Sequence, residues 1–443
     1  MDRREFLKKA GLGAAVLGMG ACAPRVLKDE DDKSVAVTDG KVVSHYDGVG
    51  LLGYGCMRWP VVKGEDERSH IDQDEVNALV DYALEHGVNY FDTSPVYLEG
   101  DSERATAQAL NRHPRSEWLL ATKLSNFSDF SYDNSVKMYR KSLEIFNTDH
   151  VDYYLLHALS GGDDFRRRFG ETGIMDFLLK EREAGHILNL GFSFHGPESG
   201  FNELMALHEK YHWDFVQIQM NYVDWTHAGK GNASAKFLYN ELDSREIPII
   251  IMEPLRGGRL ADLPAALSDE LKARDPQSSL ASWAFRFVGS FPRVKCVLSG
   301  MTYMNHLQDN LSTFIGFKPL DEEEKEFLEI TAEKMENYPL VRCTGCQYCM
   351  PCPYGINIPA IFKFYNDNVN AGTYVVSKEQ QGYARTRRKY LLAYDKAIPS
   401  VRQADHCISC GRCVPACPQK IAIPRELRRI DNYIETLKRE DFQ

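Results

Sequence analysis

The stretch Val151-Asp152-Tyr153-Tyr154-Leu155-Leu156-His157 is short, mostly apolar and closed by a polar residue. Such a run is typical of a strand that is buried on both faces, as the strands of a parallel sheet are. Seven similar runs lie at residues 50–57, 88–91, 118–123, 187–193, 215–222, 247–252 and 294–298. Amphipathic stretches separate the runs, and the clearest lie at residues 75–85, 134–146, 177–183, 235–242 and 279–287.

This alternation of strands and helices occurs eight times between residues 46 and 320. It predicts an α/β fold, a (β/α)8 TIM barrel. A doubly wound sheet shows a similar alternation, but it normally carries a Gly-rich turn directly after its first strand. We expect no G-x-G-x-x-G turn of this kind in the chain. A charged helix at residues 322–335 then leads into a cysteine-rich segment, so we expect a second domain at residues 321–443.

The chain has 443 residues, 43% of them hydrophobic, and a formal net charge of −10. Nucleic-acid binding usually requires a basic face, so no nucleic-acid partner is expected. The basic run Arg385, Arg387, Arg388 and Lys389 fits a solvated helix face, or a docking patch for an acidic redox partner protein. No run of about 18 apolar residues follows the N-terminus, so no transmembrane span is expected in the mature chain.

The N-terminus has the pattern of a targeting segment. Arg3 and Arg4 lie in a basic start, and a short apolar stretch follows at residues 10–21. It resembles a twin-arginine signal, the kind that exports proteins already folded around a cofactor. We expect a signal segment at residues 1–22, a disordered linker at residues 23–45 and export to the periplasm. Cleavage before Cys22 would leave a cysteine for a lipid anchor, and a membrane-anchored lipoprotein facing outside the cytoplasm is favoured over simple release.

Eight of the eleven cysteines form two tight runs near the C-terminus. Each run reads C-x2-C-x2-C and ends in a fourth cysteine that precedes a proline; the members are Cys343, Cys346, Cys349, Cys352, Cys407, Cys410, Cys413 and Cys417. This spacing is that of [4Fe–4S] ligation, in which three thiolates come from one loop. Structural zinc normally uses two separated C-x2-C pairs, and a disulfide framework does not suit a chain with a large core. The runs predict two [4Fe–4S] clusters in a ferredoxin-like, mostly α-helical dicluster domain.

The cluster that each fourth cysteine binds is ambiguous in the sequence. In two-cluster ferredoxins this cysteine binds the other cluster. Cys352 therefore binds either the cluster of its own run or that of the second run. Cys417 likewise binds either the cluster of its own run or that of the first run. The remaining strand cysteines, Cys56 and Cys296, are expected in the core.

Active sites of (β/α)8 barrels form at the carboxyl ends of the strands, and four polar residues are predicted there. Asp92 closes the second strand, Lys123 the third and His157 the fourth. Tyr97 follows Asp92 on a loop. Reduction of a carbonyl needs a proton donor beside its oxygen, and a phenol serves best when a nearby cation lowers its pKa. We expect Tyr97 to be the general acid, with Lys123 as the cation and Asp92 as its partner. His157 would orient the carbonyl.

These residues make the chain resemble the aldo-keto reductase family over residues 46–315. The resemblance rests on Phe91-Asp92-Thr93-Ser94-Pro95-Val96-Tyr97, Thr122-Lys123, Leu155-Leu156-His157, Gly191-Phe192-Ser193, Gln217-Ile218-Gln219-Met220-Asn221-Tyr222 and the segment from Ser299-Gly300 to Asp309-Asn310. It implies the same four catalytic roles and an aldo-keto reductase-like barrel at residues 46–320. The cysteine-rich extension looks like that of an iron–sulfur subgroup of the family.

The resemblance also implies a nicotinamide dinucleotide, NAD(P), lying across the barrel mouth. Its expected contacts are Ser193 and Gln219 at the nicotinamide end, Leu255 and Gly257, and Ser299, Gly300, Asp309 and Asn310 at the adenosine end. Arg256-Gly257-Gly258 resembles the loop of the family that covers the pyrophosphate. The chain departs from the family pattern at Phe194, where an asparagine is usual, and at Met252, where an aromatic ring is usual. Between Ser299 and Asn310 only His306 can carry a positive charge, so NAD is favoured over NADP.

The leading hypothesis is an exported oxidoreductase that reduces a carbonyl or oxidises an alcohol with a bound nicotinamide, coupled to electron transfer through the two clusters. An isomerase or lyase that uses trapped NAD in a redox-neutral reaction, with structural clusters, is the alternative. A non-catalytic electron carrier is a third. The expected partners are a small-molecule carbonyl or alcohol substrate and a redox protein. Residues 160–172 and Glu253 are candidates for substrate contacts.

Overall fold

A computed structural model describes residues 40–46, 48–64, 69–375 and 377–440. The expected signal segment, most of the expected linker and Cys22 lie outside these residues, so export and lipidation stay predictions. Within the described ranges, no helix has both the length and the apolar character that crossing a membrane requires.

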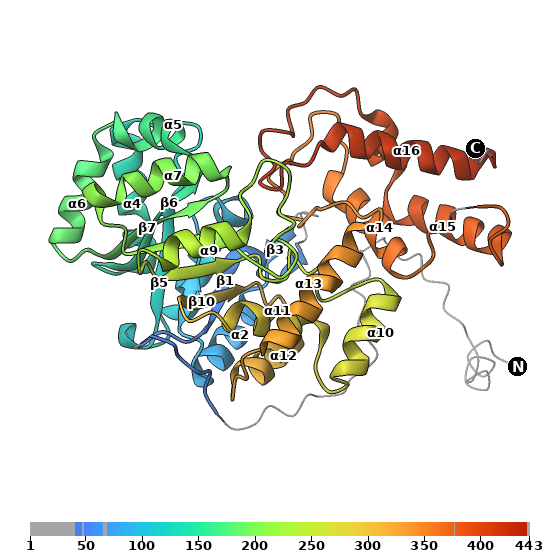
Figure 1. The fold of residues 1–443 in the computed structure, drawn as a ribbon. Coiled ribbons are helices and arrows are strands. Elements are labelled where there is room, and N and C mark those ends of the chain that lie inside the picture. Colours follow the sequence, from blue (N-terminus) through green and yellow to red (C-terminus); the bar gives the residue numbers. More distant parts are fainter. Residues whose placement is uncertain (1–39, 47, 65–68, 376, 441–443) are drawn as a thin grey trace, which may run out of the picture. The chain divides into compact units, whose positions relative to one another are not determined.

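Eight parallel strands close into a barrel, which confirms the predicted (β/α)8 fold (Figure 1). The first strand closes the ring, because Tyr54 lies opposite Phe91 on one side and Ser299 on the other. The strands are β1 (Leu52–Gly55), β4 (Tyr90–Asp92), β5 (Leu119–Leu124), β6 (Val151–Leu159), β7 (Ile187–Phe194), β8 (Phe215–Gln219), β9 (Ile249–Met252) and β10 (Val294–Ser299). Each of the eight predicted runs overlaps one of them.

Alternate residues of a strand face the inside and the outside of the barrel. On β6, Tyr153 and Leu155 belong to the small cluster of side chains that fills the barrel, together with Cys296. Tyr154 and Leu156 belong to the large core under the helices. This period of two arises because successive Cβ atoms point to opposite faces of a sheet.

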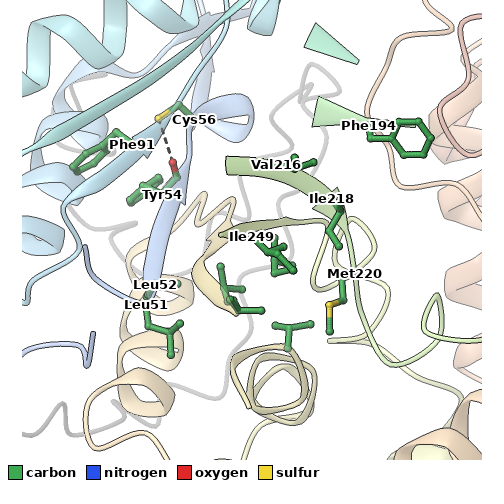
Figure 2. Close-up of a cluster of buried hydrophobic side chains, with 14 of the residues drawn as sticks. Leu51, Leu52, Tyr54, Cys56, Phe91, Phe194, Val216, Ile218, Met220 and Ile249 are labelled. Atoms are coloured by element: carbon green, nitrogen blue, oxygen red, sulfur yellow. Dashed lines mark hydrogen bonds between the residues drawn. The ribbon is translucent and has the colours of Figure 1, made fainter. Parts of the chain in front are cut away.

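The large core lies between the strands and the surrounding helices, and Figure 2 shows part of it. Leu52, Phe91 and Ile249 enter it from three different strands. Cys56 is fully buried there, with its sulfur 3.7 Å from the carbonyl oxygen of Tyr54. Cys56 and the equally buried Cys296 are thus core residues, as predicted.

The helices around the barrel include all five predicted amphipathic stretches. α4, for example, starts after Ser131, whose hydroxyl accepts a hydrogen bond from the backbone of Asn134, and ends at Asn147 in the left-handed conformation. The barrel helices are α2 (Gln73–Glu85), α3 (Ser102–Leu110), α4 (Tyr132–Phe146), α5 (Gly162–Phe165), α6 (Ile174–Glu183), α7 (Glu198–Ala206), α8 (His208–Tyr211), α9 (Ala235–Asp243), α10 (Ala265–Arg274), α11 (Leu280–Gly289) and α12 (Met304–Phe314).

Two features near the first strand go beyond the prediction. β2 (Val61–Lys63) and β3 (Ser69–Ile71) form an antiparallel pair outside the barrel. The sequence also contains a G-x-G-x-x-G pattern at residues 48–53, which leads into β1 rather than following a strand. Packing explains its last glycine, because a Cβ on Gly53 would lie 2.5 Å from the sulfur of Cys296.

A second hydrophobic core includes Val341 and holds the C-terminal helices. These are α14 (Ile358–Asn370), α15 (Tyr383–Ala397) and α16 (Ile423–Arg439), which group together in Figure 1. α13 (Glu322–Glu336) lies beyond the expected boundary at residue 320, but it packs into the barrel core through Leu328 and Ala332. The C-terminal domain is mostly helical, as predicted.

The two cysteine runs occupy equivalent places in this domain. Each run ends in the pattern C-P-x-x-I-x-I-P, at residues 352–359 and 417–424. The last proline of the pattern lies in the first turn of α14 or α16. Proline suits this turn because its missing N–H would have no partner there. The domain therefore contains two similar units of cysteine loop and helix.

Candidate active site and cluster sites

Asp92 and Lys123, at the ends of the neighbouring strands β4 and β5, form a buried ion pair. Lys123 Nζ lies 2.6 Å from Asp92 Oδ1 and donates a second hydrogen bond, of 2.7 Å, to the carbonyl oxygen of Thr93. Burial lowers the pKa of Lys123 and raises that of Asp92, and the charge of each residue opposes the shift of the other. The structure brings this predicted pair together away from solvent.

Tyr97 follows β4 in a short turn (Tyr97–Gly100) and is only 8% exposed. Lys123 Nζ lies 4.8 Å from the centroid of its ring. Burial first, then Tyr348 and Asp92, hold the pKa of Tyr97 well above its ordinary value in this state, and the expected lowering by Lys123 stays a prediction. The Lys123 ammonium lies over the phenol ring at the distance of a cation–π interaction.

His157, near the end of β6, faces Tyr97 edge-on with ring centroids 5.9 Å apart. Its Nδ1 lies 2.6 Å from the hydroxyl of Ser125 and 3.4 Å from that of Ser94. Burial, followed by the charge of Lys123, holds the pKa of His157 well below its ordinary value. The imidazole is therefore neutral, and the serine contacts at Nδ1 leave Nε2 for a substrate oxygen.

Two residues that hold His157 were not found from the sequence. Ser125 comes two positions after Lys123, at a strand end, and that position was the available signal. Arg168 Nη2 donates a 2.8 Å hydrogen bond to the carbonyl oxygen of His157, and its guanidinium is buried. Arg168 lies in the 160–172 segment that was expected to contact substrate, and here this residue supports His157 instead.

Ser193 and Gln219, expected at the nicotinamide end, lie at the ends of β7 and β8, but protein groups already bind them. Ser193 Oγ accepts a 2.8 Å hydrogen bond from the backbone N–H of Ala158. Gln219 Nε2 donates to Asp224 Oδ2 at 2.6 Å, and Gln219 Oε1 accepts from Gln419 Nε2 at 2.9 Å. Both ends of the Gln219 amide are therefore used.

The first cysteine run closely approaches the expected pyrophosphate segment after β9 at Gly257. A Cβ on Gly257 would lie only 2.2 Å from the carbonyl oxygen of Thr344. Leu255 is half-buried and packs on the barrel core. The glycine thus makes room for protein backbone.

The four residues expected at the adenosine end lie together after β10. Asn310 Nδ2 donates a 2.8 Å hydrogen bond to Ser299 Oγ. Asp309 accepts one of 2.8 Å from the serine that caps α11. Gly300 packs against the side chain of Arg58, whose Cδ would lie 3.0 Å from an added Cβ.

The departures from the family pattern are also visible in the structure. Phe194 is buried against Phe201, with ring centroids 5.0 Å apart, and so belongs to the core. The sulfur of Met252 accepts a long contact of 3.7 Å from Gln217. Glu253 accepts a hydrogen bond from Gln419, and burial raises its pKa to about 7.

The eight cluster cysteines form two groups. Each group combines the first three cysteines of one run with the last cysteine of the other run. Burial raises the pKa of Cys346 to about 11, and Cys343 and Cys417 add to the shift. The pKa values of Cys343 and Cys349 are likewise raised by burial and by Cys417. The second group is Cys352, Cys407, Cys410 and Cys413, because the other three raise the pKa of Cys413 after burial. The cysteine before each proline therefore lies with the opposite run.

The first group fits a [4Fe–4S] cluster. Its four cysteines line an open pocket of about 330 Å³ together with the apolar residues Ile358, Phe362, Ile421 and Ile423. The four thiols lie close enough to make one another harder to ionise, and their surroundings are apolar. Four such cysteines provide the thiolate ligands that a [4Fe–4S] cluster requires. In the described part of the chain, no group of three or more His, Cys, Asp or Glu side chains is placed to hold a single metal ion.

Comparison with known families agrees with this geometry. Residues 51–332 match the aldo/keto reductase family, and residues 342–423 match the 4Fe-4S dicluster domain. The chain belongs to the aldo/keto reductase family. It is an aldo-keto reductase-type oxidoreductase whose barrel is followed by a 4Fe-4S dicluster ferredoxin domain.

Individual relatives match the barrel. L-galactose dehydrogenase of Arabidopsis thaliana is 24% identical over 304 residues, which cover 64% of this chain and 90% of the relative. The uncharacterized oxidoreductase YqkF of Bacillus subtilis is 24% identical over 309 residues, which cover 63% of this chain and 92% of the relative. The structure of a Bacillus halodurans aldo-keto reductase in its holo form matches with a TM-score of 0.51 and 20% identity. The match covers 64% of this chain and 92% of that protein. At 20% identity, this structural similarity establishes the fold alone.

Proposed function

We propose that this oxidoreductase reduces a carbonyl or oxidises an alcohol at the barrel mouth, with Tyr97 as the proton donor, and that the reaction is coupled to electron transfer through two [4Fe–4S] clusters. One observation carries the proposal: the Tyr97 ring contacts Lys123 Nζ at 4.8 Å and faces the ring of neutral His157 at 5.9 Å, all three buried. The relatives include a dehydrogenase and reductases by name, which supports both reaction directions.

Each residue then has one task. Tyr97 donates its proton to the oxygen on which negative charge develops. His157 donates a hydrogen bond from Nε2 to the same oxygen, because Ser125 engages Nδ1. Asp92 holds Lys123 under the phenol ring, so that the cation stabilises the phenolate left after proton transfer.

Whether a nicotinamide fits is a separate question. When bound, a nicotinamide would supply a hydride. In this structure, however, the amide of Gln219 is taken up by Asp224 and Gln419, and Gly257 is covered by Thr344. The residues present do not fit the dinucleotide, so the proposal includes no hydride step. The preference for NAD over NADP stays a prediction for any dinucleotide that binds.

The cellular setting belongs to the proposal as well. The twin-arginine pattern supports export of the chain with its clusters already inserted, and Cys22 offers a lipid anchor. A redox protein outside the cytoplasm would then exchange electrons with the clusters.

Tyr97→Phe tests the proposed reaction, with Tyr303→Phe as the matched control because Tyr303 is 43% exposed. Turnover of a panel of aldehydes, ketones and quinones is followed anaerobically with reduced viologen and, separately, with NADH. We expect kcat/KM to fall about a hundredfold in Tyr97→Phe and to stay unchanged in the control. Equal activity of all three proteins would overturn the role of Tyr97.

A further inference from the structure

The second cysteine run contacts the barrel where the nicotinamide was expected. Gln419, two residues after Cys417, donates through Nε2 to Gln219 Oε1 at 2.9 Å and to Glu253 Oε2 at 3.0 Å. In return, Gln219 Nε2 lies 3.5 Å from Gln419 Oε1. A carboxamide offers one acceptor oxygen and one NH2 donor. The buried Gln419 side chain thus presents to Gln219 the same group that a nicotinamide would present.

The first cysteine run fills the neighbouring pyrophosphate position. Thr344 lies between Cys343 and Cys346, and its carbonyl oxygen would meet a Cβ on Gly257. The same oxygen accepts a hydrogen bond from Arg58 Nη2. The flexible glycine turn and a nearby arginine are features that suit a phosphate. Here both contact the backbone of the cysteine run.

The charges of this region are directed at the cluster ligands. Arg58 lies against the first cysteine run, because its Nη2 donates to the Thr344 carbonyl oxygen and would lie 3.8 Å from a Cβ on Gly345. A [4Fe–4S] cluster with four thiolates carries net negative charge, which buried guanidinium groups offset.

A pyrophosphate would meet a less favourable field here. Arg256 already lies 3.4 Å from Asp224 as its ion-pair partner. Glu253 adds a carboxylate whose negative form would repel a phosphate.

We infer that the iron–sulfur domain takes the place of the dinucleotide in this chain. Gln419 and Thr344 fill the nicotinamide and pyrophosphate positions. Arg58 offsets the charge of the cluster bound at Cys343 and its three partners. The inference rests on the proposed function, because it names what lies beside Tyr97 in the same site.

The source of electrons changes accordingly. A [4Fe–4S] cluster passes one electron at a time, so the donor is a low-potential one-electron carrier rather than NADH. Each carbonyl takes two electrons from two donor molecules and two protons. The π bond between carbon and oxygen is replaced by an O–H bond, with the proton from Tyr97, and a C–H bond, with a proton from solvent.

Nucleotide binding to the full chain with both clusters tests the inference directly. Protein purified anaerobically is denatured with acid and the released nucleotides are quantified. NADH and NADPH are then titrated into a second sample in a calorimeter. We expect no bound nucleotide and no saturable heat. Stoichiometric nucleotide, or saturable binding of either one, would overturn the inference.

The reduction potential of the clusters reports on the charge of Arg58. Arg58→Leu is compared with Arg245→Leu, a barrel-surface arginine paired with Glu241. We expect one cluster to become harder to reduce in Arg58→Leu, because a nearby positive charge favours the added electron. The potentials of the Arg245→Leu control should equal those of the wild type. Identical potentials in all three proteins would overturn this part. The nucleotide test on the wild-type chain does not depend on the folding of either variant.

The outcomes separate this inference from the proposed function. Saturable NADH binding together with an inactive Tyr97→Phe would overturn the inference and keep the Tyr97 reaction. Absence of nucleotide binding together with an active Tyr97→Phe would overturn the Tyr97 reaction and keep the occupied dinucleotide site.

Discussion

The phenol of Tyr348 lies beside the phenol of Tyr97, and each acts on the pKa of the other. Tyr348 lies between Cys346 and Cys349, so the first cysteine run reaches Tyr97 in the barrel. After burial, Tyr348 is the next cause that raises the pKa of Tyr97. A substrate oxygen that accepts the Tyr97 proton must take the place of the Tyr348 hydroxyl beside the Tyr97 phenol.

Tyr348→Phe should therefore lower KM. The substrate no longer competes with the Tyr348 hydroxyl, a polar contact worth about 1 kcal/mol, which corresponds to roughly fivefold in KM, while kcat stays close to the wild-type value. Steady-state kinetics on the cluster-loaded protein measures both constants. Tyr354→Phe is the control, because Tyr354 follows the same cysteine run and is 42% exposed. A raised KM in Tyr348→Phe would contradict the competition and mean that Tyr348 positions Tyr97.

The buried pair Asp92 and Lys123 predicts a rescue of stability without a rescue of activity. Lys123→Met leaves a buried carboxylate without its partner and should cost about 3–5 kcal/mol, seen as a lower melting temperature. The double variant Asp92→Asn with Lys123→Met should regain most of that loss and remain inactive. Lys141→Met, which breaks the exposed pair with Glu144, should change stability by less than about 0.5 kcal/mol. A double variant as unstable as the single one would refute the argument.

Glu253 predicts a stability that falls as pH rises. Its pKa of about 7 in the folded chain is above the value of an exposed carboxyl, so the folded state holds the proton more tightly than the unfolded state. The contribution is fully present below about pH 4.5 and is lost as pH rises through about 7. Melting temperatures of Glu253→Gln should exceed those of the wild type at pH 8 and approach them at pH 5.5. Glu144→Gln, a change at an exposed carboxylate, should follow the wild type at both pH values. A constant difference between Glu253→Gln and the wild type would show that Glu253 does not titrate in this range.

Gly257 and Gly258 are neighbours with one difference, which makes them a matched pair. Both have positive φ, +72° and +95°, but only a Cβ on Gly257 would strike Thr344, whereas nothing lies within 4 Å of one on Gly258. Gly257→Ala should loosen the first cysteine run and speed the removal of iron by a chelator. Gly258→Ala should be strained only in its backbone, because of the positive φ, and should release iron at nearly the wild-type rate. Equal rates in the two variants would contradict the contact between the cysteine run and the barrel.

The crossed cysteine groups predict which substitutions are equivalent. Cys417→Ala should abolish the same cluster as Cys343→Ala, whereas Cys352→Ala should abolish the one that Cys407→Ala abolishes. Each variant should keep about four of about eight irons. The electron paramagnetic resonance spectra of the reduced proteins should then be alike within each pair. If Cys352→Ala instead gives the spectrum of Cys343→Ala, each run binds its own cluster.

Much of the fold could be predicted because it depends on periodicity. The eight apolar runs fall on the eight barrel strands, since a strand buried on both faces must be apolar along its whole length. The β2–β3 pair was missed because Val61 and Val62 are exposed and show no alternation. The pairing of Ser125 with His157 was also missed, because it depends on which neighbouring strand ends meet.

By itself, the sequence determined the class of this protein: strand spacing specified the barrel, strand-end residues specified Asp92, Lys123 and His157, and cysteine spacing specified the clusters. These patterns are local in the sequence, so the geometry of single strands and loops is enough to account for them. Only the tertiary structure decided that Cys417 joins the first run, that Tyr348 reaches Tyr97 and that Gln419 binds Gln219. The last contact joins residues 200 positions apart. No periodicity or spacing specifies such contacts, because they arise only when two separately folded cores pack against each other.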